Sequence, residues 1–164
     1  MSYPFIVERS DEGYAASAAQ FPTLAASKNR DELGRLMAEQ LALVLQDYRE
    51  RSEKPPEANA LEEIDTSDYE EGTYEIILVE PAELSPISLS IEEAIEGQGL
   101  SRAELARRMN VPASVVSRLT NPFYWGHSAK SLREVAAALN AELEVRFVQP
   151  KRRWTSGGDV NASM

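Results

Sequence analysis

A cluster of basic side chains lies between residues 101 and 133, and cations of this kind neutralise the phosphates of nucleic acids. This stretch holds six basic residues and one acidic residue, Glu104, whereas the whole chain of 164 residues has a formal net charge of −10. A basic cluster in an otherwise acidic chain predicts a nucleic-acid partner for this stretch. The six residues are Arg102, Arg107, Arg108, Arg118, Lys130 and Arg133.

Short helices with clear start signals must position these side chains. Ser90 with Glu93, and Ser101 with Glu104, have the spacing of a capping box, in which two side chains satisfy free backbone N–H groups at a helix start. The first box predicts a helix that opens at Ser90. The second predicts a helix over residues 102–109.

Turn residues separate this helix from the next one. Asn110 suits a tight turn, because Asn adopts the left-handed backbone conformation more readily than most residues with a side chain. Pro112 supplies a fixed φ at the start of a predicted helix over residues 113–119. Asn121 and the proline after it end this helix. A further helix is predicted over residues 131–139.

The stretch Ser101 to Leu119, SRAELARRMNVPASVVSRL, resembles the helix-turn-helix of the phage-repressor superfamily. The resemblance implies that small Ala106 lets the two helices cross closely and that the second helix enters the major groove of duplex DNA. It leaves open whether Arg118 reads a base or holds a phosphate. The alternative is a helical bundle with a solvated basic face. The DNA-binding candidates are Arg107, Arg108, Ala113, Ser114, Ser117, Arg118, Asn121 and Lys130.

Two nearby features have more than one interpretation. His127 is the only histidine and the chain has no cysteine, so we expect neither a metal site nor another cofactor. The segment from Phe123 to Gly126 is aromatic and has the residue types that stack on single-stranded bases. Packing of this loop against its own domain, with Tyr124 touching the phosphate backbone of DNA, is the favoured interpretation.

The first half of the chain has the pattern of a small α+β domain. Residues 3–8 and 14–18 read as a hairpin, with a third extended piece over residues 23–28 and another strand over residues 74–79. An amphipathic helix is predicted over residues 30–51, opened by a capping box of Asn29 and Glu32. Its apolar stripe consists of Leu33, Leu36, Met37, Leu41, Val44, Leu45 and Tyr48.

The charge divides with the predicted domains. Residues 1–85 hold seven basic and nineteen acidic residues, whereas residues 86–164 hold ten basic and eight acidic residues. We predict an acidic domain over 1–80, a linker over 81–88, a helical domain over 89–148 and a disordered tail over 149–164. An acidic half joined to a locally basic half indicates partners of opposite charge.

The helical domain is followed by a short alternating segment. Residues 142–148, ELEVRFV, alternate polar and apolar side chains, which predicts a strand. A single strand leaves its own edges unpaired, so we expect it to pair across a homo-oligomer, a dimer or a tetramer. Dimerisation also suits a helix-turn-helix that reads two half-sites.

With both halves considered, the chain resembles the HicB antitoxins of HicA–HicB toxin–antitoxin pairs, over about residues 3–148. The resemblance implies a partial ribonuclease-H-like N-terminal domain that binds and neutralises a small basic RNase toxin of the HicA kind. It also implies that the helix-turn-helix represses the operon by binding double-stranded operator DNA. The features that match are the hairpin, Phe21-Pro22 before a short strand, the helix over 30–51, Pro55-Pro56 and the strand over 74–79.

Two other classes of function stay open. A transcriptional regulator whose N-terminal domain senses a small molecule would need a concave apolar pocket in that domain. A nuclease would need carboxylates that converge on metal ions, and pairs such as Asp11 with Glu12 fall in predicted turns. We therefore expect no enzymatic activity. No signal peptide and no bilayer-spanning apolar run is visible, which predicts a cytoplasmic protein without a membrane partner.

Overall fold

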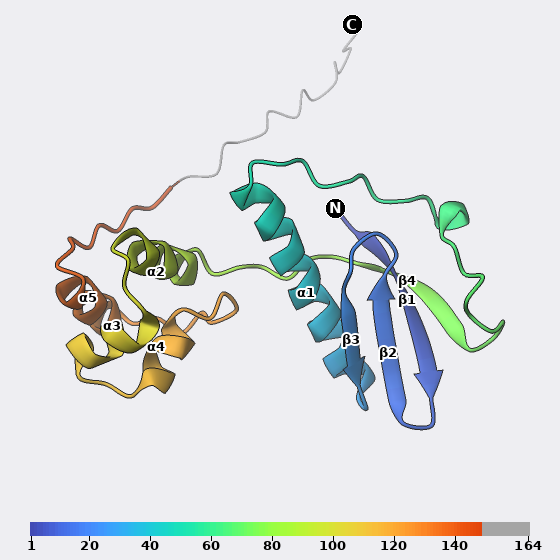
Figure 1. Cartoon of the computed structure of the whole chain (residues 1–164), viewed down its shortest axis with the longest axis horizontal. Helices are drawn as coiled ribbons and strands as arrows, with labels where there is room; N and C mark the ends of the chain where they lie inside the picture. The colour runs from blue at the N-terminus through green and yellow to red at the C-terminus, as the bar shows by residue number, and fades with distance from the viewer. Residues whose placement is uncertain (149–164) are drawn as a thin grey trace, which may run out of the picture.

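The computed structural model describes residues 1–148, and the tail predicted to be disordered, 149–164, lies outside the described residues. Over the described part the chain is a mixed α+β protein with a four-stranded antiparallel sheet and five α-helices. Figure 1 shows two bodies, a sheet covered by one helix and a group of four helices, joined by a short connection. The predicted α+β class is confirmed.

The first two strands form the predicted hairpin. β1 (Tyr3–Ser10) pairs antiparallel with β2 (Gly13–Ala18), and Ser10 lies opposite Gly13, so that two residues form the turn. Gly13 has a φ of 138°, which favours glycine. A Cβ at this position would lie 2.7 Å from the carbonyl oxygen of Ser27. Glycine is therefore required where the hairpin turn approaches the next strand.

The sheet has the order β3-β2-β1-β4, with β3 (Leu24–Ser27) and β4 (Tyr74–Val79) at its two edges. Helix α1 (Arg30–Glu50) lies against one face of it (Figure 1). The predicted apolar stripe of α1 is confirmed, because its members are buried or pack at the margin of the core. The buried core residues of this body are Tyr3, Phe5, Val7, Ala16, Phe21, Ala25, Leu33, Met37, Leu41, Leu45 and Val79.

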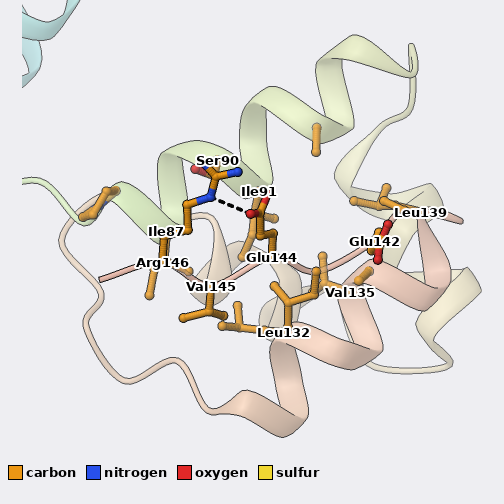
Figure 2. A pocket seen from close by; sticks show the side chains of 15 residues that line it. Ile87, Ser90, Ile91, Leu132, Val135, Leu139, Glu142, Glu144, Val145 and Arg146 are labelled. Carbon is orange, nitrogen blue, oxygen red and sulfur yellow. Dashed lines mark hydrogen bonds and ion pairs between the residues drawn. The ribbon is translucent and has the colours of Figure 1, made fainter. Parts of the chain in front are cut away.

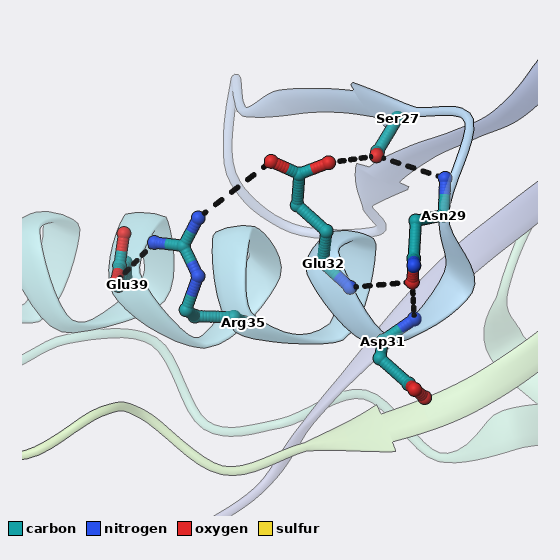
Figure 3. Close-up of polar contacts among 6 residues, drawn as sticks. All are labelled: Ser27, Asn29, Asp31, Glu32, Arg35 and Glu39. Atoms are coloured by element: carbon teal, nitrogen blue, oxygen red, sulfur yellow. Dashed lines mark hydrogen bonds and ion pairs between the residues drawn. The ribbon is translucent and has the colours of Figure 1, made fainter.

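The start of α1 is capped as predicted on one side only. The side-chain oxygen of Asn29 accepts hydrogen bonds from the backbone N–H groups of Asp31, at 2.8 Å, and Glu32, at 3.2 Å (Figure 3). The carboxylate of Glu32 does not return to the backbone N–H of Asn29. It accepts from the hydroxyl of Ser27, whose oxygen itself accepts from the Asn29 N–H at 3.0 Å. The reciprocal half of the predicted capping box is wrong, because Ser27 occupies that place.

The segment between α1 and β4 is irregular apart from a short 3₁₀ helix, η1 (Leu61–Glu63). Hydrogen bonds tie both of its ends to the sheet. The hydroxyl of Tyr3 donates to the carbonyl of Pro56 at 2.9 Å, and the hydroxyls of Ser17 and Tyr69 lie 3.2 Å apart. The pKa of the Tyr3 hydroxyl is raised above the ordinary value of a tyrosine, mainly because the side chain is buried. The segment therefore follows a defined path beside the sheet.

Four helices form the second body: α2 (Pro86–Gly97), α3 (Arg102–Met109), α4 (Ala113–Leu119) and α5 (Ala129–Ala138). The predicted helices over 102–109 and 113–119 are confirmed. Burial of apolar side chains between all four helices holds them together. The buried members of this core are Ile91, Ile95, Leu105, Ala106, Val116, Leu119, Val135 and Leu139.

Helix α2 begins earlier than predicted. Ser85 is its N-cap and accepts from the backbone N–H of Ser88 at 3.3 Å, while Ser90 lies within the helix. The prediction of a helix that opens at Ser90 is therefore wrong, because α2 begins at Pro86, within the predicted linker over 81–88. Pro86 makes the early start possible, because the first helical position needs no backbone N–H.

Helix α5 begins two residues before the predicted start. Ser128 is its N-cap, and a reciprocal capping box joins Ser128 with Ser131. Sequence reasoning missed this box because its third residue is Ser rather than the usual Glu or Gln.

Residues 141–148 have no regular secondary structure, so the predicted strand over 142–148 is wrong for the single chain. A strand needs ladder hydrogen bonds from a neighbour, and β-strands of this chain pair only within the N-terminal sheet among the described residues. The apolar side chains of the segment are exposed, as expected for an alternating sequence without a partner. They are Leu143, Val145, Phe147 and Val148.

The connection between the two bodies is held by backbone hydrogen bonds on both sides. The N–H of Ala82 donates to the carbonyl of Ala38 in α1 at 2.9 Å. The N–H of Ser85 donates to the carbonyl of Pro122, after α4, at 2.7 Å. None of the helices in residues 1–148 combines the length and the apolar character needed to cross a membrane.

Candidate nucleic-acid interface

A tight turn sets the angle between α3 and α4. Asn110 ends α3 in the left-handed conformation, with φ 53° and ψ 46°, as the sequence predicted. The N–H of Val111 then donates to the carbonyl of Ala106 at 3.0 Å. Ala106 and Val116 are buried between the helices, and the small side chain of Ala106 permits their close approach.

The exposed face of α4 gathers four of the predicted DNA-binding residues. Val116 and Leu119 point into the core, with 0% and 3% of their surfaces exposed. The side chains of Ala113, Ser114, Ser117 and Arg118 are exposed and lie on the opposite face, at the spacing of successive helical turns. This face carries two hydroxyl groups and one cation, which can donate to or accept from base edges and phosphates.

The two basic residues in the last turn of α3 share one carboxylate. Arg107 forms an ion pair with Glu104, and the Nε of Arg108 lies 3.4 Å from the same carboxylate. One guanidinium nitrogen of Arg108 also lies within hydrogen-bond distance of the Ala138 carbonyl, at 3.4 Å. Arg108 therefore braces α3 against the end of α5, whereas the side chain of Arg107 remains 76% exposed. The backbone N–H of Glu104 donates to the hydroxyl of Ser101, which is one half of the predicted capping box. The carboxylate of Glu104 contacts Arg107 and Arg108 instead of forming the other half.

Two further predicted residues take part in local contacts. Lys130, near the start of α5, lies 3.9 Å from the carboxylate of Glu134 and is otherwise exposed. The side-chain oxygen of Asn121 accepts from the N–H of Phe123 at 2.9 Å and so shapes the turn after α4. Asn121 is thus a turn residue whose side-chain oxygen is partly engaged within the chain.

The loop after α4 packs against its own body, as the favoured interpretation predicted. The ring of Tyr124 lies edge-on to the ring of His127, at 4.8 Å between centroids, and the Tyr124 hydroxyl donates to the carbonyl of Gly126 at 2.9 Å. That hydroxyl is satisfied within the loop, which leaves the predicted Tyr124–phosphate contact without a free donor. Trp125, which belongs to the same aromatic run, is 54% exposed.

The Nε2 atom of His127 has two structural partners, whereas its Nδ1 is buried without one among the described residues. Its Nε2 lies 2.9 Å from the carbonyl of Leu119 and 3.3 Å from the hydroxyl of Ser88. The first contact requires a proton on Nε2, because a carbonyl only accepts. Within residues 1–148, no group of three or more His, Cys, Asp or Glu side chains has the arrangement of a metal site.

A groove of about 570 Å³ lies between α2, α5 and the C-terminal segment (Figure 2). Its walls are mostly apolar, and Ile87 on α2 is one of the exposed apolar side chains of this body. Val145 of the C-terminal segment lies toward Leu132 of α5 in Figure 2. The groove therefore leaves apolar side chains of α2 and of the C-terminal segment accessible at the surface.

The acidic character of the first body is concentrated beside the sheet. Residues 57–75 hold eight acidic residues and no basic residue. The hydrogen bond between Ser17 and Tyr69 lies within this segment, and that between Tyr3 and Pro56 lies directly before it. The acidic side chains of the segment are exposed. Such an array raises the negative potential on this side of the molecule.

Comparison with protein-family models and with curated proteins finds no match for this chain.

Proposed function

We propose that the chain is an antitoxin of the HicB kind, which binds operator DNA through α3 and α4 and a small basic RNase toxin through its acidic first body. The observation that carries the DNA part is the exposed face of α4, where Ser114, Ser117 and Arg118 project away from a core held by Val116. The tight turn at Asn110 supports it, since a helix presented in this way fits the major groove.

The DNA part is tested with the full chain and a duplex that carries the promoter of its own operon. Fluorescence anisotropy should show specific binding that weakens steeply with salt, because basic side chains displace counterions. Arg118→Ala should cost about 1–3 kcal/mol of binding free energy if the side chain contacts a base. The triple replacement of Arg107, Arg108 and Arg118 by alanine should abolish specific binding.

Arg49→Ala is the matched control, because it removes one exposed positive charge from α1 in the other body. It should leave promoter binding unchanged. If the triple variant binds the promoter as tightly as the unchanged protein, the α3–α4 surface is not the DNA interface.

The toxin part rests on charge. We propose that the acidic segment over residues 57–75 attracts a basic toxin, because complementary charge speeds encounter and aligns partners. Replacement of Glu62 and Glu63 by glutamine should slow association with the small basic protein encoded beside this gene, most clearly at low salt. The same number of charges removed at Asp11 and Glu12, on the hairpin turn, is the control. Equal effects of both pairs would mean that only net charge matters.

The alternative of a small-molecule sensor has less support in the first body. One hollow there is formed by the hairpin turn and Lys28, and its lining is mostly polar. A more apolar hollow beside Leu33, Met37 and Ile77 holds only about 270 Å³, less than the roughly 300–1,000 Å³ of ligand pockets. Ligand pockets are mainly apolar with few polar groups. We also expect the purified protein to cleave neither RNA nor DNA with Mg²⁺. Cleavage lost on Asp11→Asn would contradict this expectation.

We further propose that two copies associate through residues 142–148. An antiparallel pairing centred on Val145 would place Glu144 opposite the partner's Arg146 and Leu143 opposite the partner's Phe147. This register joins opposite charges on one face and apolar side chains on the other. It would also supply the ladder hydrogen bonds that the single chain lacks. Two recognition surfaces would then face two half-sites.

A further inference from the structure

Arg118 differs from the three arginines of α3 in what holds its side chain. Arg102, Arg107 and Arg108 each form an ion pair with a glutamate. Within residues 1–148, Arg118 has no carboxylate partner at ion-pair distance. Its guanidinium carbon lies instead 5.6 Å from the centroid of the Tyr124 ring. An aromatic face attracts a guanidinium while leaving the N–H groups of its edge free to donate.

The Tyr124 ring is itself fixed on several sides. The backbone N–H of Tyr124 donates to the carbonyl of Asn121 at 2.9 Å, and the hydroxyl donates to the carbonyl of Gly126 at 2.9 Å. A Cβ at residue 126 would lie 2.6 Å from the Tyr124 hydroxyl oxygen, so the loop closes on the ring only with glycine there. The ring of His127 packs against its edge.

The loop is also tied to the end of α4. His127 donates through Nε2 to the carbonyl of Leu119, one residue after Arg118, and this contact spans 2.9 Å. The ring that faces Arg118 is thus attached to the same helix through His127. Its orientation relative to α4 is set before any partner binds.

We propose that Tyr124 is a positioning residue that fixes the plane of the Arg118 guanidinium for a bidentate contact with a guanine, and so sets sequence preference at one base pair. This inference rests on the proposed DNA-binding function. Bidentate readout of a guanine edge requires a defined guanidinium plane. Phosphate oxygens accept from many directions, so a fixed plane matters less for a phosphate contact. A side chain held in place also loses less entropy on binding.

The test uses the full chain, the promoter duplex of its own operon and a set of duplexes in which each base pair of the site is changed in turn. Tyr124→Leu should lower discrimination about two- to fivefold at one base pair, the expected size of an exposed cation–π contact. Arg118→Ala should relax discrimination at the same base pair. Tyr124→Phe keeps the ring and should keep most of the discrimination. In the double variant, the effect of Tyr124→Leu should disappear.

Arg118→Lys is a second test, which stays informative even if the loop does not fold without Tyr124. It keeps the positive charge and the ring beneath it but lacks the planar fork, so it should lose discrimination at that base pair with little change in the salt dependence of binding. A loss that is uniform across all duplexes, or a salt slope that falls by about one with Arg118→Ala, would assign Arg118 to a phosphate and overturn the inference.

The outcomes also separate this inference from the function on which it rests. If the unchanged protein binds no promoter duplex in preference to unrelated DNA, both proposals fail. If the unchanged protein discriminates and Tyr124→Leu, shown to be folded by circular dichroism, discriminates equally well, only the role of Tyr124 is wrong.

Discussion

The backbone conformation of Asn110 determines how α3 meets α4. A residue with a Cβ pays a steric cost in the left-handed region, and Asn pays less than most because its short side chain can bond locally. Asn110 has a φ of 53° there, and its N–H and that of Val111 close the end of α3. The angle of the candidate interface therefore depends on one turn residue that is not among the predicted DNA contacts.

We expect Asn110→Ala to destabilise the protein by about 1 kcal/mol, because alanine has no side chain to offset the left-handed strain. Asn110→Gly is the matched control and should be neutral or slightly stabilising, since glycine adopts this conformation freely. Thermal unfolding followed by circular dichroism measures both. Equal losses for alanine and glycine would show that the Asn side chain, rather than the backbone angle, matters here.

A second single-residue effect concerns the pH dependence of the first body. The hydrogen bond from Arg30 to Glu75, with the charge of the guanidinium, holds the pKa of the Glu75 carboxyl below its ordinary value. A carboxyl whose pKa is lower in the folded state stabilises the fold above its unfolded value, and this contribution is lost as the pH falls through the folded value. Both side chains are about half exposed, so the effect is small.

We expect Glu75→Gln to lower the unfolding temperature slightly at about pH 7 and the difference to shrink towards zero in acid, below the folded-state pKa of Glu75, where the unchanged protein also lacks this negative charge. Glu71→Gln, an exposed carboxylate before β4, is the control and should change stability at neither pH. A difference between Glu75→Gln and the unchanged protein that persists in acid would mean that packing, not charge, explains it.

At the scale of an element, the start of α2 shows which of two candidate caps the helix uses. Ser85 is fully buried, and its side chain accepts from the N–H of Ser88, while its own N–H donates to Pro122. It thus caps α2 and joins this helix to the loop after α4. Ser90, the cap that the sequence predicted, is exposed within the helix.

Ser85→Ala should destabilise the helical body by about 0.5–2 kcal/mol, the usual cost of a lost N-cap. Ser90→Ala is the matched control and should be neutral or slightly stabilising, because alanine favours a helix interior. Chemical denaturation of the two variants gives the comparison. A larger loss for Ser90→Ala would place the functional start of α2 at Ser90 after all.

At the scale of the whole molecule, the unpaired C-terminal segment makes association of two copies testable. The proposed antiparallel register places Val145 opposite the same residue of the partner, with Cα atoms about 4.5–5.5 Å apart. That separation suits a disulfide. The chain has no cysteine, so any disulfide that forms must involve the one introduced thiol of each copy.

Val145→Cys should therefore form a covalent dimer under mild oxidation, seen by gel electrophoresis without reductant. Phe147→Cys is the control, because the same register separates the two copies of residue 147 by four positions along the strand, about 13 Å at the usual rise. Crosslinking of residue 147 in preference to residue 145 would show a different register. A monomer in light scattering at all concentrations would remove the association altogether.

The sequence by itself determined the local elements. Period-two and period-three-to-four apolar patterns predicted the hairpin and α1, and the turn residues Asn110 and Pro112 bounded α3 and α4 correctly. The exposed face of α4 followed from the same helical period. These features depend on neighbours in the chain, so their physics is visible in a short window of residues.

Only the tertiary structure decided which of several side chains able to form the same cap or ion pair actually form it. Ser85 and Ser90 both have side chains that can cap α2. The helix uses Ser85, whose backbone N–H also donates to the carbonyl of Pro122. Glu104 is drawn to arginines in place of its predicted return to the helix start. The contact of Arg118 with Tyr124 joins α4 to a loop that folds back on it, and closing that loop depends on Gly126 and His127. Such contacts join different elements, so the spacing of residues within one element does not predict them.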